Sequence, residues 1–183
     1  MELIIYLDAD SLPLKHREII LKRCIKENII TFFVADRELK DVKEAIKQHT
    51  IMLRSPYRAT LDNQEIRKIK SSIEMIVVEG GVNAADDRIV SLANKNNLCI
   101  THDIPLAARL IEKGVVVIDD RGNRLDKSNI NERLSIRDTQ MTLREMGIFN
   151  DKQKQFDLKT YNAFANAFDK AITELKKDKI TKK

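Results

Sequence analysis

Short apolar runs recur along the chain, and each is followed by a polar stretch with helical spacing. The runs are rich in Ile and Val and do not alternate with polar residues, which is typical of strands buried on both faces of a parallel sheet. Alternation of strands and helices predicts an α/β fold, a three-layer sandwich around a mainly parallel sheet. The predicted strands are Leu3–Leu7, Ile29–Val34, Ile51–Leu53, Met75–Val78, Leu98–Ile100 and Val115–Ile118.

Local signals mark where several of the intervening helices begin and end. Pro13 stands early in the first helix, and Pro105 stands in the first turn of the helix that follows Asp103. Asp86 opens another helix, and Gly114 closes the helix that precedes the last predicted strand.

Two parts of the chain depart from this alternation. The charged region 37–72 has a weaker pattern, so we expect irregular structure or short helices there. From about residue 128 onward the pattern predicts only helices, at 129–146 and 158–177. We therefore expect one domain over 1–177, a Lys-rich tail at 178–183, and disorder in about the last eight residues.

The second C-terminal helix carries an apolar stripe that should pack against the body of the protein or against a partner, so a homodimer is among the expected assemblies. The stripe consists of Tyr161, Phe164, Phe168, Ile172 and Leu175.

Composition narrows the class of protein. The chain has 183 residues, of which 43% are hydrophobic and 33% charged, as in a soluble globular domain. No apolar run reaches the roughly 18 residues of a membrane span, and the N-terminus lacks a secretory pattern. Cys24 and Cys99 have no metal-ligand spacing, so we expect reduced core residues of a cytoplasmic protein. No glycine motif for dinucleotides or for a P-loop is present.

The net charge of +5 suggests nucleic-acid binding until it is divided along the chain. Residues 170–183 hold six lysines and two acids, a surplus of +4. The other 169 residues carry 27 bases and 26 acids, so the body is nearly neutral. A nucleic-acid hypothesis therefore depends on the placement of particular residues, and the pI contributes little to it.

Acidic residues follow four of the predicted strands. In an open parallel sheet, ligands bind at the carboxyl ends of the strands. Carboxylates gathered there raise one another's pKa, and a shared divalent cation removes that cost. Oxygen ligands without cysteine favour Mg²⁺ or Mn²⁺, ions that organise phosphoryl chemistry. The acids are Asp8, Asp10, Asp86, Asp87, Asp103, Asp119 and Asp120.

Structural roles compete with this interpretation. Asp86 and Asp103 each stand where an aspartate N-cap stabilises a helix by ~1 kcal/mol. Pairing with Arg121 in a turn is the structural alternative for Asp119 and Asp120, and a local hydrogen bond is the alternative for His102. Independent capping, however, does not explain acids at every one of these strand ends.

Three cations are candidates for the same edge of the sheet. Arg137 and Arg144 project from the apolar face of the predicted helix 129–146, where a guanidinium needs carboxylate or phosphate partners. A salt bridge to a site aspartate and a phosphate contact both remain open. Lys15 could reach the edge or remain a solvated surface lysine.

With these residues in place, the sequence resembles the YaiI/YqxD family of uncharacterised bacterial proteins over roughly residues 2 to 170. It departs from the family at Ser11, where cysteine is usual, and at 148–151, which replace a Gly-Gly-Pro-like stretch. The matching stretches are Asp8–Lys15, Ala84–Val90, Thr101–Ala107, Asp119–Gly122, Asn129–Ile130, Arg133–Leu134, Arg137–Asp138 and Leu143–Arg144.

That family is similar to the PIN-like nucleases. Their pattern has an acid ending the first strand, an acid opening a helix, and an acid after the next strand. Asp8, Asp86 (with Ile89 and Ala93) and Asp103 match it. The resemblance implies a metal-dependent nuclease for RNA, or less readily for DNA, in which these three residues hold Mg²⁺ or Mn²⁺. Asp10 and Asp87 would support the metal or orient water. The expected phosphate-binding residues are Lys15, Arg121, Arg137 and Arg144.

Two other hypotheses stay open. Asp8 and Asp10 after an apolar strand resemble the haloacid-dehalogenase motif, with Asp8 as nucleophile and Asp10 as general acid. That motif usually has Thr or Val where Leu12 stands. The second alternative is a non-catalytic module that binds nucleic acid or protein.

Overall fold

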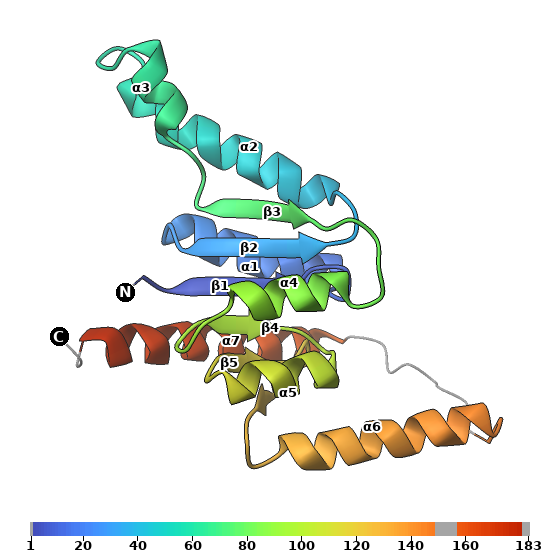
Figure 1. Ribbon diagram of the computed structural model, residues 1–183. Coiled ribbons are helices and arrows are strands. Elements are labelled where there is room, and N and C mark those ends of the chain that lie inside the picture. The colour runs from blue at the N-terminus through green and yellow to red at the C-terminus, as the bar shows by residue number, and fades with distance from the viewer. Residues whose placement is uncertain (1, 149–156, 181–183) are drawn as a thin grey trace.

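A computed structural model describes residues 2–148 and 157–180 (Figure 1). It contains a six-stranded sheet of order β3-β2-β1-β4-β5-β6, in which the first five strands are parallel and β6 is antiparallel to β5. The predicted α/β architecture with a mainly parallel sheet is therefore confirmed. The strands are β1 (Ile4–Asp8), β2 (Ile30–Ala35), β3 (Ile73–Val77), β4 (Leu98–Ile100), β5 (Val116–Ile118) and β6 (Arg124–Leu125).

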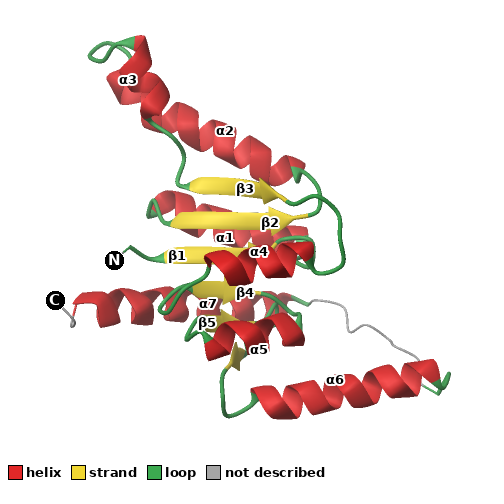
Figure 2. Ribbon diagram, viewed as in Figure 1, coloured by secondary structure: helices red, strands yellow, loops and turns green. Residues whose placement is uncertain are grey.

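Helices cover both faces of the sheet (Figure 2). α1, α2 and α7 pack on one face, and α4 and α5 pack on the other. α6 lies beside α5 and extends beyond the sandwich (Figure 1). The helices are α1 (Leu14–Lys26), α2 (Lys40–Arg54), the 3₁₀ helix η1 (Ser55–Tyr57), α3 (Asn63–Lys68), α4 (Ala84–Leu92), α5 (Ile104–Glu112), α6 (Ile130–Glu145) and α7 (Leu158–Ile180).

Strand β1 connects the two hydrophobic cores. Its side chains alternate between the faces of the sheet. Ile5 and Leu7 are buried in the core under α1 and α7, whereas Tyr6 is buried in the core under α4 and α5. This double burial fixes the register of β1 and thereby the position of Asp8 at its carboxyl end.

The apolar stripe of α7 packs against the body of the protein, one of the two outcomes expected from its pattern. Phe164, Phe168, Ile172 and Leu175 are all buried in the core that includes β1 and α1. The helix continues to Ile180, so the expectation of disorder over the last eight residues is wrong for most of that segment. Residues 181–183 lie outside the described residues.

The region 37–72 differs most from expectation. Ile51–Leu53, predicted as a strand, lies in the last turns of the 15-residue helix α2. Val42 and His49, seven residues apart, face the core, whereas Ile51 and Met52 are exposed. The three apolar residues are thus two surface positions and one half-buried position of a helix. The short antiparallel strand β6 was not predicted.

Other expectations agree with the structure. Cys24 and Cys99 are free thiols in the core, and burial raises the pKa of Cys24 to about 12. Gly114 has a positive φ of 76° just after α5, as its predicted role requires. Across the described ranges 2–148 and 157–180, no helix is long and apolar enough to cross a membrane.

Candidate functional site

The strand order reverses direction between β1 and β4. The chain runs from β1 through β2 to β3 on one side, and then returns to add β4 and β5 on the other. In open α/β sheets, ligands bind outside the strand carboxyl ends at such a switch point. Asp8 is the last residue of β1, and Asp103 follows β4 by three residues. The two acids therefore flank the crevice that the topology creates.

Asp8 is a buried carboxylate at this crevice. It is 8% exposed, and its Oδ2 accepts a hydrogen bond of 3.0 Å from Thr101 Oγ1. Burial raises the pKa of Asp8, and the nearby charge of Asp103 raises it further. A carboxylate in this position gains from a cation that restores its charged form.

Asp103 serves as the N-cap of α5, which confirms the capping interpretation for this residue. Its Oδ1 accepts a hydrogen bond of 2.7 Å from the Leu106 backbone N–H. Its own backbone N–H donates to Thr101 Oγ1 at 3.0 Å. The Thr101 hydroxyl thus joins Asp8 to the start of α5. Sequence reasoning did not single out Thr101, although a hydroxyl directly after a buried strand was the available signal.

Asp86 has no capping role, contrary to the structural alternative considered for it. The N-cap position of α4 is Asn83, with φ of 64°, and Asp86 is the third residue of the helix, in its first turn. Burial, followed by the charges of Asp103 and Asp8, raises the pKa of Asp86 to about 6. Its carboxylate accepts no hydrogen bond from the residues that the structure describes. Its charge is therefore poorly compensated.

Asp87 lies in a different environment from Asp86, although both were candidates for the site from the sequence. Its Oδ1 pairs with Arg109 of α5 at 2.7 Å, and its side chain is 64% exposed. Asp86, by contrast, lines a cavity of about 210 Å³ together with Asp10. The helix thus directs Asp86 toward this cavity and Asp87 toward α5.

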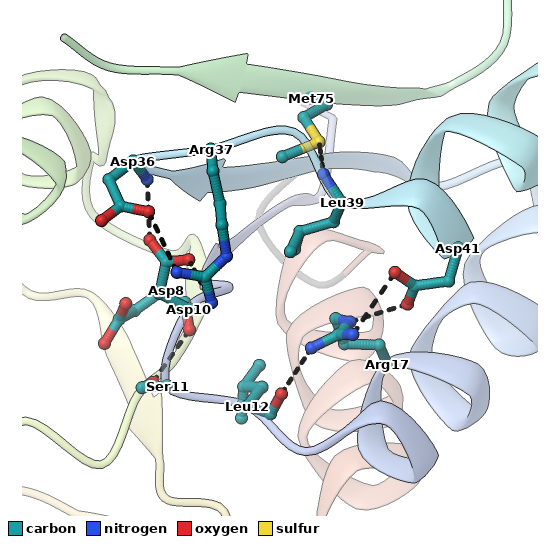
Figure 3. A network of polar contacts seen from close by, with 10 residues as sticks. All are labelled: Asp8, Asp10, Ser11, Leu12, Arg17, Asp36, Arg37, Leu39, Asp41 and Met75. Carbon is teal, nitrogen blue, oxygen red and sulfur yellow. Dashed lines mark hydrogen bonds and ion pairs between the residues drawn. The ribbon is translucent and has the colours of Figure 1, made fainter.

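Asp10 is held by the loop after β2. Its Oδ2 accepts a hydrogen bond of 2.7 Å from the Asp36 backbone N–H, and its Oδ1 lies 3.4 Å from Arg37 (Figure 3). The ion pair with Arg37 was not foreseen. It reduces the negative charge that Asp10 contributes next to Asp86.

Asp119 organises the turn after β5. It accepts hydrogen bonds from the backbone N–H groups of Arg121 at 2.9 Å and Asn123 at 2.7 Å. These bonds support a structural role for Asp119. The neighbouring Asp120 has a pKa raised by burial, and its carbonyl lies 2.7 Å from His16 Nε2.

A second cavity, of about 550 Å³, opens beside Asp103. It lies between the start of α5 and one face of α6. Arg137 and Arg144 line it together with Asp103. Arg137 pairs with Asp138, its neighbour in sequence, at 3.4 Å, so this ion pair involves no site aspartate. The cavity is lined by His102, Asp103, Ile104, Arg133, Ile136, Arg137, Gln140, Met141 and Arg144.

Lys15 lies elsewhere. Its Nζ is 5.2 Å from the centre of the Tyr161 ring on α7, a cation–π contact. Arg121 is exposed in the turn after β5. Of the four cations predicted at the site, Arg137 and Arg144 line a cavity together with a site acid, Asp103.

The acids do not form a preassembled metal centre. Within the described part of the chain, no three His, Cys, Asp or Glu side chains are gathered closely enough to hold an ion. The charges of Asp103 and Asp8 nevertheless raise the pKa of Asp86, and the charge of Asp103 also raises that of Asp8, so the three acids share one electrostatic environment. Their donor atoms are all oxygens, which suits Mg²⁺ or Mn²⁺ better than zinc.

Comparison with known proteins shows which family this chain matches. Residues 55–174 match the family described as "Uncharacterized BCR, YaiI/YqxD family". The UPF0178 protein of Proteus mirabilis is 34% identical over 96% of this chain and 99% of its own length. The UPF0178 protein of Desulfotalea psychrophila is 34% identical over 94% of this chain and 99% of its own. No solved structure matches the chain significantly. The chain therefore belongs to the YaiI/YqxD family.

Proposed function

We propose that this protein is a divalent-metal-dependent nuclease that acts on RNA in preference to DNA. One observation carries the proposal: Asp8, Asp86 and Asp103 come from three separate segments, Asp8 and Asp103 flank the switch point of the sheet, and their charges raise the pKa of Asp86. Capping accounts for Asp103 alone. The preference for RNA follows from the resemblance to PIN-like nucleases, which is part of the same proposal.

In this proposal Asp8, Asp86 and Asp103 hold Mg²⁺ or Mn²⁺. The bound ion would offset the charge of the phosphate and lower the pKa of a water molecule. Thr101 fixes the orientation of the Asp8 carboxylate through its hydrogen bond. Asp10, held by Asp36 N–H and Arg37, is placed to orient water on the side of the cavity that it shares with Asp86.

The arginines of α6 supply the phosphate contacts. Arg137 and Arg144 line the cavity that begins at Asp103, so a phosphate chain lying in it would end at the acids. Guanidinium groups bind phosphate with two parallel hydrogen bonds and retain their charge at any working pH. Arg121 is a further candidate from the turn after β5, whereas Lys15 is engaged with Tyr161.

The neighbouring acids of α4 provide a matched test. Cleavage of a labelled RNA of about 30 nucleotides would be measured with Mn²⁺ for wild type, Asp86→Asn and Asp87→Asn. We expect Asp86→Asn to lose about 100-fold or more in rate, since metal ligands carry several kcal/mol of transition-state stabilisation. Asp87→Asn should stay within about threefold, because that side chain pairs with Arg109.

Other outcomes would assign the site differently. Equal cleavage by wild type, Asp8→Asn and Asp86→Asn would contradict the proposal. A phosphoryl group trapped on Asp8 would indicate a phosphohydrolase in its place. RNA binding without cleavage, unchanged by EDTA and by Asp8→Asn, would indicate a binding module.

A further inference from the structure

One face of α6 gathers arginines and exposed apolar side chains. Arg133, Arg137 and Arg144 lie at positions i, i+4 and i+11, with Gln140 between them, and all four line the cavity of about 550 Å³. Positions with this spacing share one side of a helix. Arg133 and Gln140 are not part of the proposed nuclease site.

Apolar side chains lie on the same face. Ile136 is 45% exposed and Met141 is 47% exposed, and both line the cavity between the arginines. The helix is anchored by its first turns, where Ile130 is buried and Leu134 packs against the core. Beyond them α6 extends away from the sandwich (Figure 1). An exposed face that mixes apolar and cationic groups is typical of a binding surface.

We propose that this face of α6 is a subsite for an extended nucleic-acid strand, and that it binds the strand without metal. The inference rests on the proposed nuclease function and deepens it. Arg133, Arg137 and Arg144 bind successive backbone phosphates, while Ile136 and Met141 lie against ribose or base surfaces. Gln140 supplies an uncharged hydrogen-bonding group between them.

The length of the face determines the length of the ligand. Arg133 and Arg144 are eleven residues apart, which is about 16 Å along a helix at 1.5 Å per residue. One nucleotide does not reach across this distance, but a chain of several nucleotides does. In this proposal the cleaved bond lies beside Asp103, which lines the same cavity as the arginines. A bound strand must therefore extend several nucleotides to one side of the cleaved bond.

A second copy of this chain fits the face less well. In a two-fold dimer the same patch appears on both subunits, so arginines would lie opposite arginines. Like charges brought together across an interface oppose association. Within the described residues, Arg133 forms no ion pair and Arg137 pairs only with Asp138, at 3.4 Å. The face therefore favours a polyanion.

Salt dependence of binding tests the inference. Binding of a labelled single-stranded RNA of about 12 nucleotides would be followed by fluorescence anisotropy in EDTA over a range of NaCl concentrations. We expect Arg133→Ala, Arg137→Ala and Arg144→Ala each to weaken binding about fivefold. Each should also lower the slope of log K against log salt by about 0.7, the value for one phosphate of a single strand. Arg67→Ala, an exposed arginine of α3, is the control and should change neither quantity.

Length supplies an independent readout. Affinity for oligonucleotides of about 2, 4, 8 and 12 nucleotides should rise until the strand spans α6, and this rise should disappear in the triple arginine variant. Circular dichroism and thermal unfolding would establish that each variant is folded.

The outcomes separate the two proposals. Binding in EDTA with the expected arginine dependence, but without cleavage in Mn²⁺, supports the subsite and contradicts the nuclease. Cleavage that depends on Asp86, with RNA binding indifferent to the three arginines, overturns the subsite alone. Absence of RNA binding, equal binding of poly-glutamate, or an α6-dependent dimer would also overturn it.

Discussion

Acidic residues of the candidate site can stabilise the fold by helix capping and destabilise it by mutual repulsion. Asp103 caps α5 and is also one of three acids that repel one another. The charges of Asp103 and Asp8 raise the pKa of Asp86, Arg109 offsets them only in part, and the carboxylate accepts no hydrogen bond within the described residues. A group held at a cost to stability is typical of a functional site. The two residues can therefore be separated by substitution.

Replacing Asp86 tests the cost of the acidic cluster. Because the pKa of Asp86 rises from 3.8 to about 6 on folding, the folded state binds this proton more tightly than the unfolded state. Stability is therefore lost as pH rises through about 4 to 6, and it stays lower above that range. In EDTA at about pH 7.5, we expect Asp86→Asn to be more stable than wild type by about 1 kcal/mol, allowing for its partial exposure.

Urea unfolding at two pH values would measure this difference, which should vanish near pH 4. Asp87→Asn is the control and should give no gain, since it loses the ion pair with Arg109. Equal stability of Asp86→Asn and wild type at about pH 7.5 would contradict the prediction.

Two substitutions of Asp103 separate its cap from its charge. Asn retains an N-cap oxygen, whereas Ala does not, so only Asp103→Ala should lose about 1 kcal/mol of unfolding free energy. Both should lose metal-dependent cleavage if Asp103 holds the ion. Chemical denaturation together with the RNA assay would measure the two effects. Full activity in a stable Asp103→Asn variant would show that Asp103 caps α5 and does not hold the ion.

At the scale of elements, contacts between segments place the site edge. The turn after β5 packs against α7, and a Cβ added at Gly122 would lie 2.7 Å from the Ala163 carbonyl oxygen. Gly122 also has φ of 83°. Backbone conformation and close approach thus both require glycine there. This turn carries Asp119 and Asp120, so α7 helps to position the edge although it contributes no acid of the site.

A pair of glycine substitutions isolates this contact. Gly122→Ala should destabilise the protein by about 3 kcal/mol, because it adds a steric clash to the cost of a positive φ. Gly147→Ala shares a positive φ of 70° but meets nothing within 4 Å, so about 1 kcal/mol is expected. Thermal or urea unfolding would measure both. Equal losses would show that backbone strain alone accounts for Gly122.

For the whole molecule, α7 completes the core that β1 and α1 begin. Phe164 and Phe168 have no exposed surface and lie among residues from the N-terminal strands. The C-terminal helix therefore shares one hydrophobic core with the first strand, and we expect the two to unfold together. Loss of α7 would open the core beneath the site.

Cooperative unfolding tests this arrangement. Phe168→Ala should cost about 4 kcal/mol, the usual loss for a buried phenylalanine, and should lower the unfolding midpoint of the entire chain. Leu158→Ala, at a position 74% exposed on the same helix, should cost less than about 0.5 kcal/mol. Fluorescence and circular dichroism should report the same transition for each variant. Separate transitions would show that α7 unfolds independently.

Sequence pattern alone determined the strands that are buried on both sides, the helix signals at Pro13, Pro105 and Gly114, and the acids at the strand ends. These are local properties: periodicity, backbone preference and position after a strand. It failed at Ile51–Leu53, because a run of three apolar residues has no period by which helix and strand can be distinguished.

Only the tertiary structure decided which partners the acids and cations meet. It directed Asp86 toward Asp8 and Asp103 and Asp87 toward Arg109, a distinction that adjacent identical residues cannot carry in sequence. It placed Arg133 and Gln140 in the α6 cavity and Lys15 on Tyr161. Such choices depend on which segments meet across the sheet, and those contacts are made between residues far apart in the chain.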